Sequence, residues 1–196
     1  MLEMVFGNTD MFIAMISGIM CLVACIPMIN CVNHFRSEEK RHRMEQIFAG
    51  SVSRESMLGS FLLIALVQMI LFPILGALGM YATSFHTTHL GELMEASAVY
   101  IPALLFMIGL TAALLGWFPG FTKWIWALFG YAFFMFYFGR IFTNLPEFLP
   151  SLSPFGHVPQ LPLEEFKVAP LVVLSVMGIV LIVLGFMGIK KRDIRA

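Results

Sequence analysis

The chain has 196 residues, of which 59% are apolar and 12% are charged, and its 12 Lys and Arg residues balance its 12 Asp and Glu residues. A soluble globular domain carries about 25% charged residues, so this composition excludes a soluble domain and predicts a membrane protein. The zero net charge gives no indication of a nucleic-acid partner, and we expect none.

Five apolar stretches are long enough to cross a bilayer as helices. They lie at about 11–33, 57–82, 97–117, 121–142 and 169–189. About 20 residues at 1.5 Å each cover the ~30 Å of hydrocarbon, whereas a membrane β-barrel shows ~10-residue segments of alternating polarity, which this sequence lacks. The predicted fold is therefore all-α, a single polytopic bundle of about five transmembrane helices over residues 1–196.

The first stretch contains three cysteines, Cys21, Cys25 and Cys31. They have no His or acidic residue at ligand distance in the sequence, so the pattern does not fit a zinc or redox site. We expect these thiols to serve packing.

The polar segment 34–56 follows, and it holds nine of the 24 Lys, Arg, Asp and Glu residues. We expect Ser37 to cap a short helix whose first turn carries Glu38 and Glu39, because acidic side chains suit the positive end of a helix. Gly50 would end this helix. Ser51 or Ser53 would then start the next helix, which continues through Arg54 into the second stretch.

The short helix expected in this segment has one narrow apolar stripe, formed by Met44, Ile47 and Phe48 at helical spacing. One interpretation of the segment is a solvated connector. We favour a docking segment, because the stripe has nothing in its own loop to pack against and requires a partner or the membrane surface to cover it.

The second stretch carries Gln68, which is a candidate for an interhelical hydrogen bond or for a substrate contact. The outer loop after it has four residues of the types that bind metals, at a spacing of three: His86, His89, Glu92 and Glu95. Gly91 interrupts the expected helix there, and the sequence has no His-Glu-x-x-His motif. We therefore expect a hydrated loop and no metal site.

The fourth stretch is dense in aromatic residues that cover the predicted helix all round, so some rings must face lipid and others the bundle. Trp124 and Trp126 are expected at a membrane boundary, where aromatic belts form. Tyr131, Phe134 and Tyr137 join Gln68 as candidate residues of a substrate path, with lipid-facing packing as the alternative. The loop after it, 143–168, is rich in proline, which predicts an ordered outer loop without regular helix.

Lys and Arg predict the orientation, because cytoplasmic loops hold them in excess. Ten of the 12 lie in segment 34–56, in the turn after the third stretch and in the C-terminal tail, whereas Arg140 and Lys167 lie on the other side. We expect the N-terminus outside and the C-terminus in the cytoplasm.

Two segments resemble a known family. RSEEKRHRMEQIFAGSVSR resembles the segment after the second membrane helix in permease subunits of bacterial ATP-binding-cassette exporters, where it forms a coupling helix seated in a cleft of the ATPase. LSPFGHVPQLP, followed by an apolar span and the tail KKRDIR, is similar to the C-terminal end of permeases in the family of polyketide-antibiotic exporters. The resemblance implies these ATPase-docking residues: Glu38, Glu39, Arg43, Glu45, Ile47, Phe48, Val52, Ser53 and Arg54.

The resemblance also implies partners and a place in the cell. Members of the family usually have six helices per half, so five spans with an outside N-terminus match one half that lacks its first helix. The implied assembly contains cytoplasmic ABC ATPase subunits and a second permease half in the lipid of the bacterial plasma membrane, and exports an amphipathic compound such as an antibiotic. No G-x-x-x-x-G-K-[ST] motif occurs in the chain, so ATP and Mg²⁺ are expected on the partner ATPase.

Two other functions remain open at this stage. The first is a non-transporting integral membrane protein that binds or regulates a partner. The second is an intramembrane metalloenzyme that uses His86, His89, Glu92 and Glu95.

Overall fold

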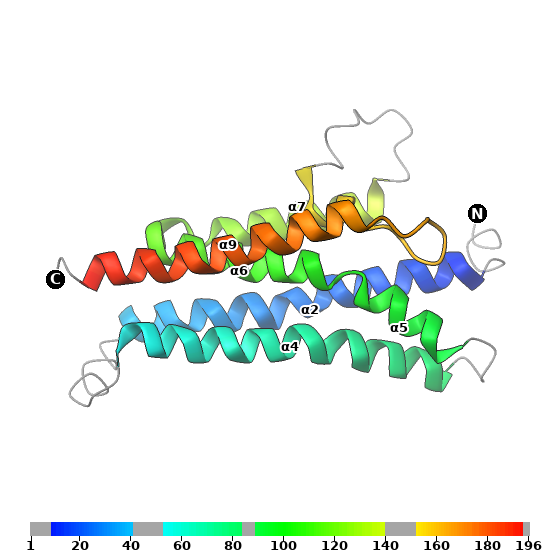
Figure 1. Ribbon diagram of the computed structural model, residues 1–196, viewed down its shortest axis with the longest axis horizontal. Helices are drawn as coiled ribbons and strands as arrows, with labels where there is room; N and C mark the ends of the chain where they lie inside the picture. Colours follow the sequence, from blue (N-terminus) through cyan, green and yellow to red (C-terminus); the bar gives the residue numbers. More distant parts are fainter. Residues whose placement is uncertain (1–8, 41–52, 84–88, 140–151, 194–196) are drawn as a thin grey trace.

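The computed structural model describes residues 9–40, 53–83, 89–139 and 152–193, except for the side chains of 39, 40, 192 and 193. Every regular element in these ranges is a helix, which confirms the all-α prediction. The helices are α2 (Thr9–Lys40), α4 (Arg54–Thr83), α5 (Leu90–Ala98), α6 (Ile101–Trp117), η1 (Pro119–Phe121), α7 (Trp124–Phe138), η2 (Pro154–His157) and α9 (Val168–Asp193) (Figure 1). Four helical segments are long and apolar enough to cross a membrane, namely α2, α4, α5 with α6, and α9.

Helix α2 continues well beyond the apolar stretch, to Lys40. Ser37 lies inside this helix, so the prediction that it caps a separate helix is wrong. The residues from 34 to 40 include no Gly or Pro, so nothing in the sequence ends the helix where the apolar stretch ends. One turn of the extension has an ion-pair contact of 3.8 Å between His34 Nδ1 and Glu38 Oε1.

Helix α4 begins as expected at the end of the polar segment. The Ser56 backbone N–H donates to Ser53 Oγ at 3.2 Å, which is the hydrogen bond of a helix N-cap. The choice between Ser51 and Ser53 is therefore settled for Ser53. The helix then runs without interruption through Pro73 to Thr83.

The third predicted stretch, 97–117, corresponds to α6, whereas α5 forms in the region before it, where a hydrated loop is expected; the chain turns at Val99 and Tyr100 between the two helices. Pro102 follows in the first turn of α6, where the missing N–H of proline breaks no helical hydrogen bond. Gly91 is the second residue of α5. The expectation that Gly91 interrupts a helix is therefore wrong, because a glycine lowers helix propensity without preventing a helix.

Helix α6 is the centre of the bundle, with buried residues on all sides. It packs along α9, and close approach of the two backbones depends on glycine. A Cβ added at Gly109 would lie 2.4 Å from the carbonyl oxygen of Gly178, and a Cβ at Gly116 would lie 2.4 Å from that of Gly185. Since both pairs advance in the same direction, α6 and α9 run parallel.

Helices α4 and α9 lie on the outside of the bundle. In the most apolar 18 residues of α4 and of α9, 28% of the residues are buried, against 56% in α2 and in α5 with α6. Large apolar side chains cover their outer faces, among them Leu63, Val67, Leu71, Val172, Val176 and Val183. These faces suit contact with lipid chains.

Helix α7 is shorter than the predicted span at 121–142. It starts at Trp124, after the 3₁₀ turn η1 formed by Pro119–Phe121, because Pro119 and Gly120 favour a turn. Its 15 residues reach about 22 Å at 1.5 Å per residue. Within the described residues 153–167 the backbone forms the 3₁₀ turn η2 and no α-helix, Leu152 before them is helical, and residues 143–151 of the predicted loop lie outside the described residues.

The bundle has two ends (Figure 1). The last turn of α2, the first turn of α4, η1 and the last turn of α9 lie together at what we call the basic end, which carries Arg36, Arg54, Lys123, Lys190 and Lys191. The start of α2, helix α5 and the loop that leads from η2 into α9 lie toward the opposite end, which we call the loop end; we call residues 153–167 the η2 segment. This separation agrees with the predicted sides, while the direction relative to the cytoplasm stays a prediction.

Candidate functional site

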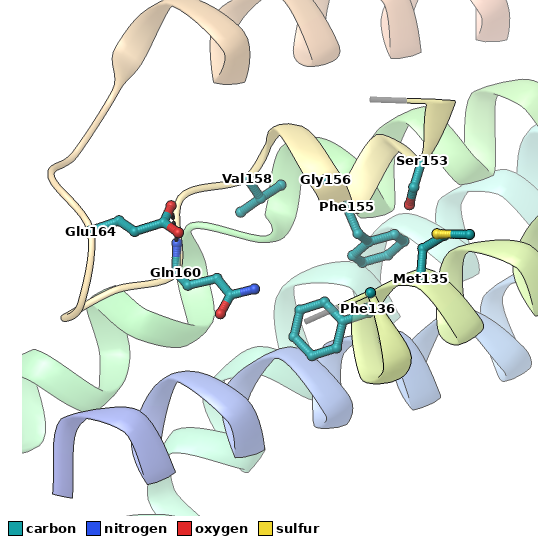
Figure 2. A pocket seen from close by; sticks show the side chains of 9 residues that line it. Met135, Phe136, Ser153, Phe155, Gly156, Val158, Gln160 and Glu164 are labelled. Carbon is teal, nitrogen blue, oxygen red and sulfur yellow. Dashed lines mark hydrogen bonds between the residues drawn. The ribbon is translucent and has the colours of Figure 1, made fainter. Parts of the chain in front are cut away.

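The described loop end contains a pocket between α7 and the η2 segment (Figure 2). Its volume is about 210 Å³, and its lining is Met135, Phe136, Gly139, Ser153, Phe155, Gly156, Val158, Gln160 and Glu164. The backbone N–H of Gln160 donates to Glu164 Oε2 at 3.2 Å on one side of the pocket. Sites for drug-sized ligands measure about 300–1,000 Å³, so this pocket is smaller than such a site.

Three aromatic rings from three elements pack together beside this pocket. The ring of Tyr100, at the joint between α5 and α6, stacks on Phe155 of η2 with centroids 6.3 Å apart. The same tyrosine meets Phe136 of α7 edge to face, also at 6.3 Å. Tyr100 and Phe155 are almost fully buried, so we call Tyr100, Phe136 and Phe155 the aromatic plug.

A polar group is buried next to the plug. Ser153 is 2% exposed, and its Oγ has no hydrogen-bond partner among the described residues. A buried hydroxyl without a partner is costly, and water or a ligand in the pocket would satisfy it. The lining of the pocket thus combines the rings of Phe136 and Phe155 with the polar residues Ser153, Gln160 and Glu164 (Figure 2).

A larger crevice lies at the same end, between the α5–α6 joint and the segment that leads into α9. Its volume is about 520 Å³, and its lining is Glu95, Ala98, Val99, Pro102, Leu161, Phe166 and Leu171. This volume and an apolar wall with one carboxylate suit an amphipathic small molecule. The crevice combines residues from two distant parts of the sequence, so no local sequence pattern indicates it.

The structure places the predicted substrate-path residues apart from these cavities. Gln68 lies near the middle of α4, and its buried Oε1 has no hydrogen-bond partner within the described part of the chain. Tyr137 stacks on Phe133 with centroids 6.4 Å apart, and Phe134 stacks on Phe138 at 5.0 Å. Phe134 and Tyr137 are exposed on α7, Tyr131 is half-buried, and none of the four residues lines the pocket of Figure 2. Their role in a substrate path stays a prediction.

Most predicted docking residues fall outside the described residues. These are Arg43, Glu45, Ile47, Phe48 and Val52. Of the others, Glu38 and Glu39 lie in the last turns of α2, Ser53 caps α4, and Arg54 is the first residue of α4. The described residues thus place both borders of the segment at the basic end (Figure 1).

The cysteines make contacts between helices. Cys21 Sγ donates to the Ser97 carbonyl at 3.6 Å, joining α2 to α5, and Cys31 Sγ donates to the Phe61 carbonyl at 3.4 Å, joining α2 to α4. These contacts agree with the expected packing role. No group of three or more His, Cys, Asp and Glu residues in the described ranges is arranged to hold a metal ion, and His86 lies outside those ranges.

The sequence of the chain matches a family and a curated protein. The model of the family described as "Multidrug efflux system permease Rv1217c, C-terminal domain" matches residues 1–190. The chain is 28% identical over 191 residues to the multidrug efflux system permease protein Rv1217c of Mycobacterium tuberculosis. This alignment covers 94% of the chain and 34% of the relative, so the chain spans about a third of the length of the curated relative it matches.

Proposed function

Because the chain belongs to the family of the C-terminal domain of the multidrug efflux system permease Rv1217c, we propose that it forms part of the membrane-spanning subunit of an ATP-driven exporter. The family match over residues 1–190 is the observation that carries this proposal. The long apolar helices α2, α4, α5 with α6, and α9 agree with a multi-pass permease. The proposed cargo is an amphipathic compound such as an antibiotic.

The proposed energy source is a separate cytoplasmic ATPase of the ATP-binding-cassette class. The chain has no motif for the phosphates of ATP, so the nucleotide and Mg²⁺ would bind on the partner. The residues proposed to dock there include Glu45, Ile47 and Phe48, in the segment 41–52 that joins α2 to α4. With the basic end in the cytoplasm, as the Lys and Arg distribution predicts, this segment faces the ATPase.

The helices that border the docking segment extend to the opposite end of the bundle. Helices α2 and α4 both contact α5 at the loop end, and α5 leads into Tyr100 of the aromatic plug. A rigid-body tilt of α2 and α4, driven by closure of the ATPase pair, would therefore move α5 against Phe155. In this mechanism the plug loosens and the crevice beside Glu95 opens outward for release of the cargo.

A second permease half is part of the proposed assembly. The chain corresponds to about a third of the length of its curated relative, and a pathway across the membrane requires walls on every side. The outer faces of α4 and α9 are apolar and exposed. These faces are available to lipid or to the other half.

Charge reversal in the docking segment tests the coupling. We expect Glu45→Lys to abolish most of the ethidium-stimulated ATPase activity of the reconstituted complex, because it places a cation where the resemblance implies an acidic docking contact. The matched control is Glu165→Lys, which makes the same change at an exposed position of the loop end and should leave the stimulation within twofold of wild type. Both variants should insert into the membrane normally, since neither changes a span.

The comparison of the two variants separates a specific loss of docking from a general effect of added positive charge. Equal stimulation in Glu45→Lys and wild type would rule out docking through this residue. Loss of stimulation in both variants would show a general effect of added positive charge and would equally contradict the proposed role of Glu45.

A further inference from the structure

A polar pocket lies at the basic end, between the last turns of α2 and the start of α7. Its volume is about 270 Å³, and its lining is Asn33, Arg36, Ser37, Thr122, Lys123 and Trp126. This pocket lies at the opposite end from the crevice, and the proposed export function does not use it.

Two cations, Arg36 and Lys123, line this pocket, and its lining among the described residues contains no carboxylate. The Arg36 guanidinium donates from Nη1 to Thr122 Oγ1, and that hydroxyl donates to the Pro119 carbonyl at 3.2 Å. Arg36 is therefore held against Thr122 on one side of the pocket, while Lys123 is exposed at the rim. A fixed guanidinium and a lysine that line the same pocket favour a phosphate, whose oxygens accept charge-assisted hydrogen bonds.

The pocket also has an unpaired amide acceptor. Asn33 Oδ1 is buried and has no hydrogen-bond partner within the described ranges. A phosphodiester group has no donor for this oxygen, but a hydroxyl group next to it has one. The lining therefore fits an anion that carries hydroxyl groups beside its phosphate.

Aromatic residues indicate the depth of the pocket in the membrane. Trp117, Phe118, Phe121 and Trp124 surround the α6–α7 turn and are exposed by 44%, 59%, 57% and 66%. Exposed aromatic rings gather at the level of the lipid headgroups. Thr122 and Lys123 lie between Phe121 and Trp124 in the sequence, so the pocket opens at that level.

We propose that this pocket binds the headgroup of an anionic phospholipid. The phosphate lies between Arg36 and Lys123, and a headgroup hydroxyl donates to Asn33 Oδ1. Basic pockets between membrane helices bind anionic headgroups in this manner. A bound lipid would join α2 to α7 at the basic end, next to the border of the docking segment.

Native mass spectrometry of the full chain in detergent tests the proposal, with phosphatidylglycerol, phosphatidylcholine and phosphatidylmethanol as probes. We expect phosphatidylglycerol to be retained at least fivefold more than phosphatidylcholine. Phosphatidylmethanol has the same charge but no headgroup hydroxyl, so it should be retained about threefold to fivefold less than phosphatidylglycerol. Lys123→Gln should lower phosphatidylglycerol retention about fivefold, whereas Lys190→Gln, an exposed lysine of the basic end outside the pocket, should leave it within twofold.

Three results would overturn the proposal. The first is equal loss of phosphatidylglycerol in Lys123→Gln and Lys190→Gln, which would mean non-specific attraction to positive charge. The second is full displacement of the lipid by an equimolar amount of free glycerol phosphate, which would make the pocket a site for a soluble phosphate. The third is displacement by an equimolar acidic peptide, which would assign the pocket to a protein partner.

Discussion

Glycine residues decide how closely the central helices approach. Gly109 and Gly116 of α6 face Gly178 and Gly185 of α9, and a Cβ at Gly185 would lie 2.7 Å from the Ala112 carbonyl oxygen. Packing of backbones through small residues is a main source of helix association in membranes, because lipid chains are as apolar as the side chains they replace. The α6–α9 pair therefore depends on shape more than on hydrophobicity.

We predict that Gly109→Ala destabilises the bundle by about 1–3 kcal/mol, because the added methyl forces two backbones apart. Gly130→Ala in α7 is the matched control, since a Cβ there meets nothing within 4 Å. The control should be neutral or stabilising by up to about 1 kcal/mol, the gain in helix propensity. Equilibrium unfolding in mixed micelles measures both, and equal stabilities of the two variants would contradict the packing account.

At the residue scale the sequence predicted side-chain roles only in part. The cysteines were expected to pack, and Cys21 and Cys31 do so against carbonyl groups of neighbouring helices. The seven-residue spacing of Gly109 and Gly116, repeated at Gly178 and Gly185, is visible in the sequence. Which helices these glycines join is a property of the tertiary structure, so the sequence alone left the pairing open.

At the scale of elements, hydropathy located the long apolar helices better than it located their ends. The apolar stretch ends near residue 33, but α2 continues to Lys40, because polar residues such as Glu38 are compatible with a helix outside the membrane. The sequence predicts a loop where α5 forms, because Gly91 and the polar residues around it favour a loop. These residues are also compatible with a helix. The end of a helix is set by hydrogen bonds that hydropathy does not report. The start of α4 is an exception, because Ser53 is one of the two capping residues that the sequence predicts.

We expect the aromatic plug to stabilise the η2 segment, and removal of the Phe155 ring tests this. We predict that Phe155→Ala raises the hydrogen-exchange rates of the Gly156 and Val158 amides at least tenfold, because truncating a buried Phe costs about 3–5 kcal/mol. These amides donate to the carbonyls of Ser153 and Phe155, at 3.0 and 3.3 Å. Leu163→Ala, at an exposed position of the same loop, should change neither rate. Unchanged exchange in Phe155→Ala would show that the plug does not hold η2.

At the scale of the whole molecule, composition and hydropathy were sufficient for the fold class and for the approximate positions of the long apolar helices. The cavities were not predictable, because each one combines distant segments, as Glu95 and Phe166 do in the loop-end crevice. The candidate rings Phe134 and Tyr137 are exposed on α7, since a helix covered with aromatic residues gives no periodic signal for its buried side. The docking residues Arg43 to Val52 lie outside the described residues and keep the status of a prediction.

The orientation of the bundle follows from the basic end and is directly testable. We predict that a membrane-impermeant maleimide labels Lys167→Cys in intact cells and labels Lys123→Cys only after the membrane is opened, because Lys and Arg collect in the cytoplasm. Wild-type protein is the control for Cys21, Cys25 and Cys31, which are buried or half-buried. The reverse labelling pattern would invert the topology and place the docking segment outside the cell.

The most direct test of the proposed function is the identity of the proteins that bind through the docking segment 34–56. The tagged full chain is to be cross-linked in membranes of its native host and purified, and its partners identified by mass spectrometry, with Glu45→Lys processed in parallel. We predict that the wild type retains an ATPase of the ATP-binding-cassette class and that Glu45→Lys loses it while keeping its other membrane partners. Absence of such an ATPase from the wild-type sample, or its undiminished recovery with Glu45→Lys, would contradict an exporter that is coupled to ATP through this segment.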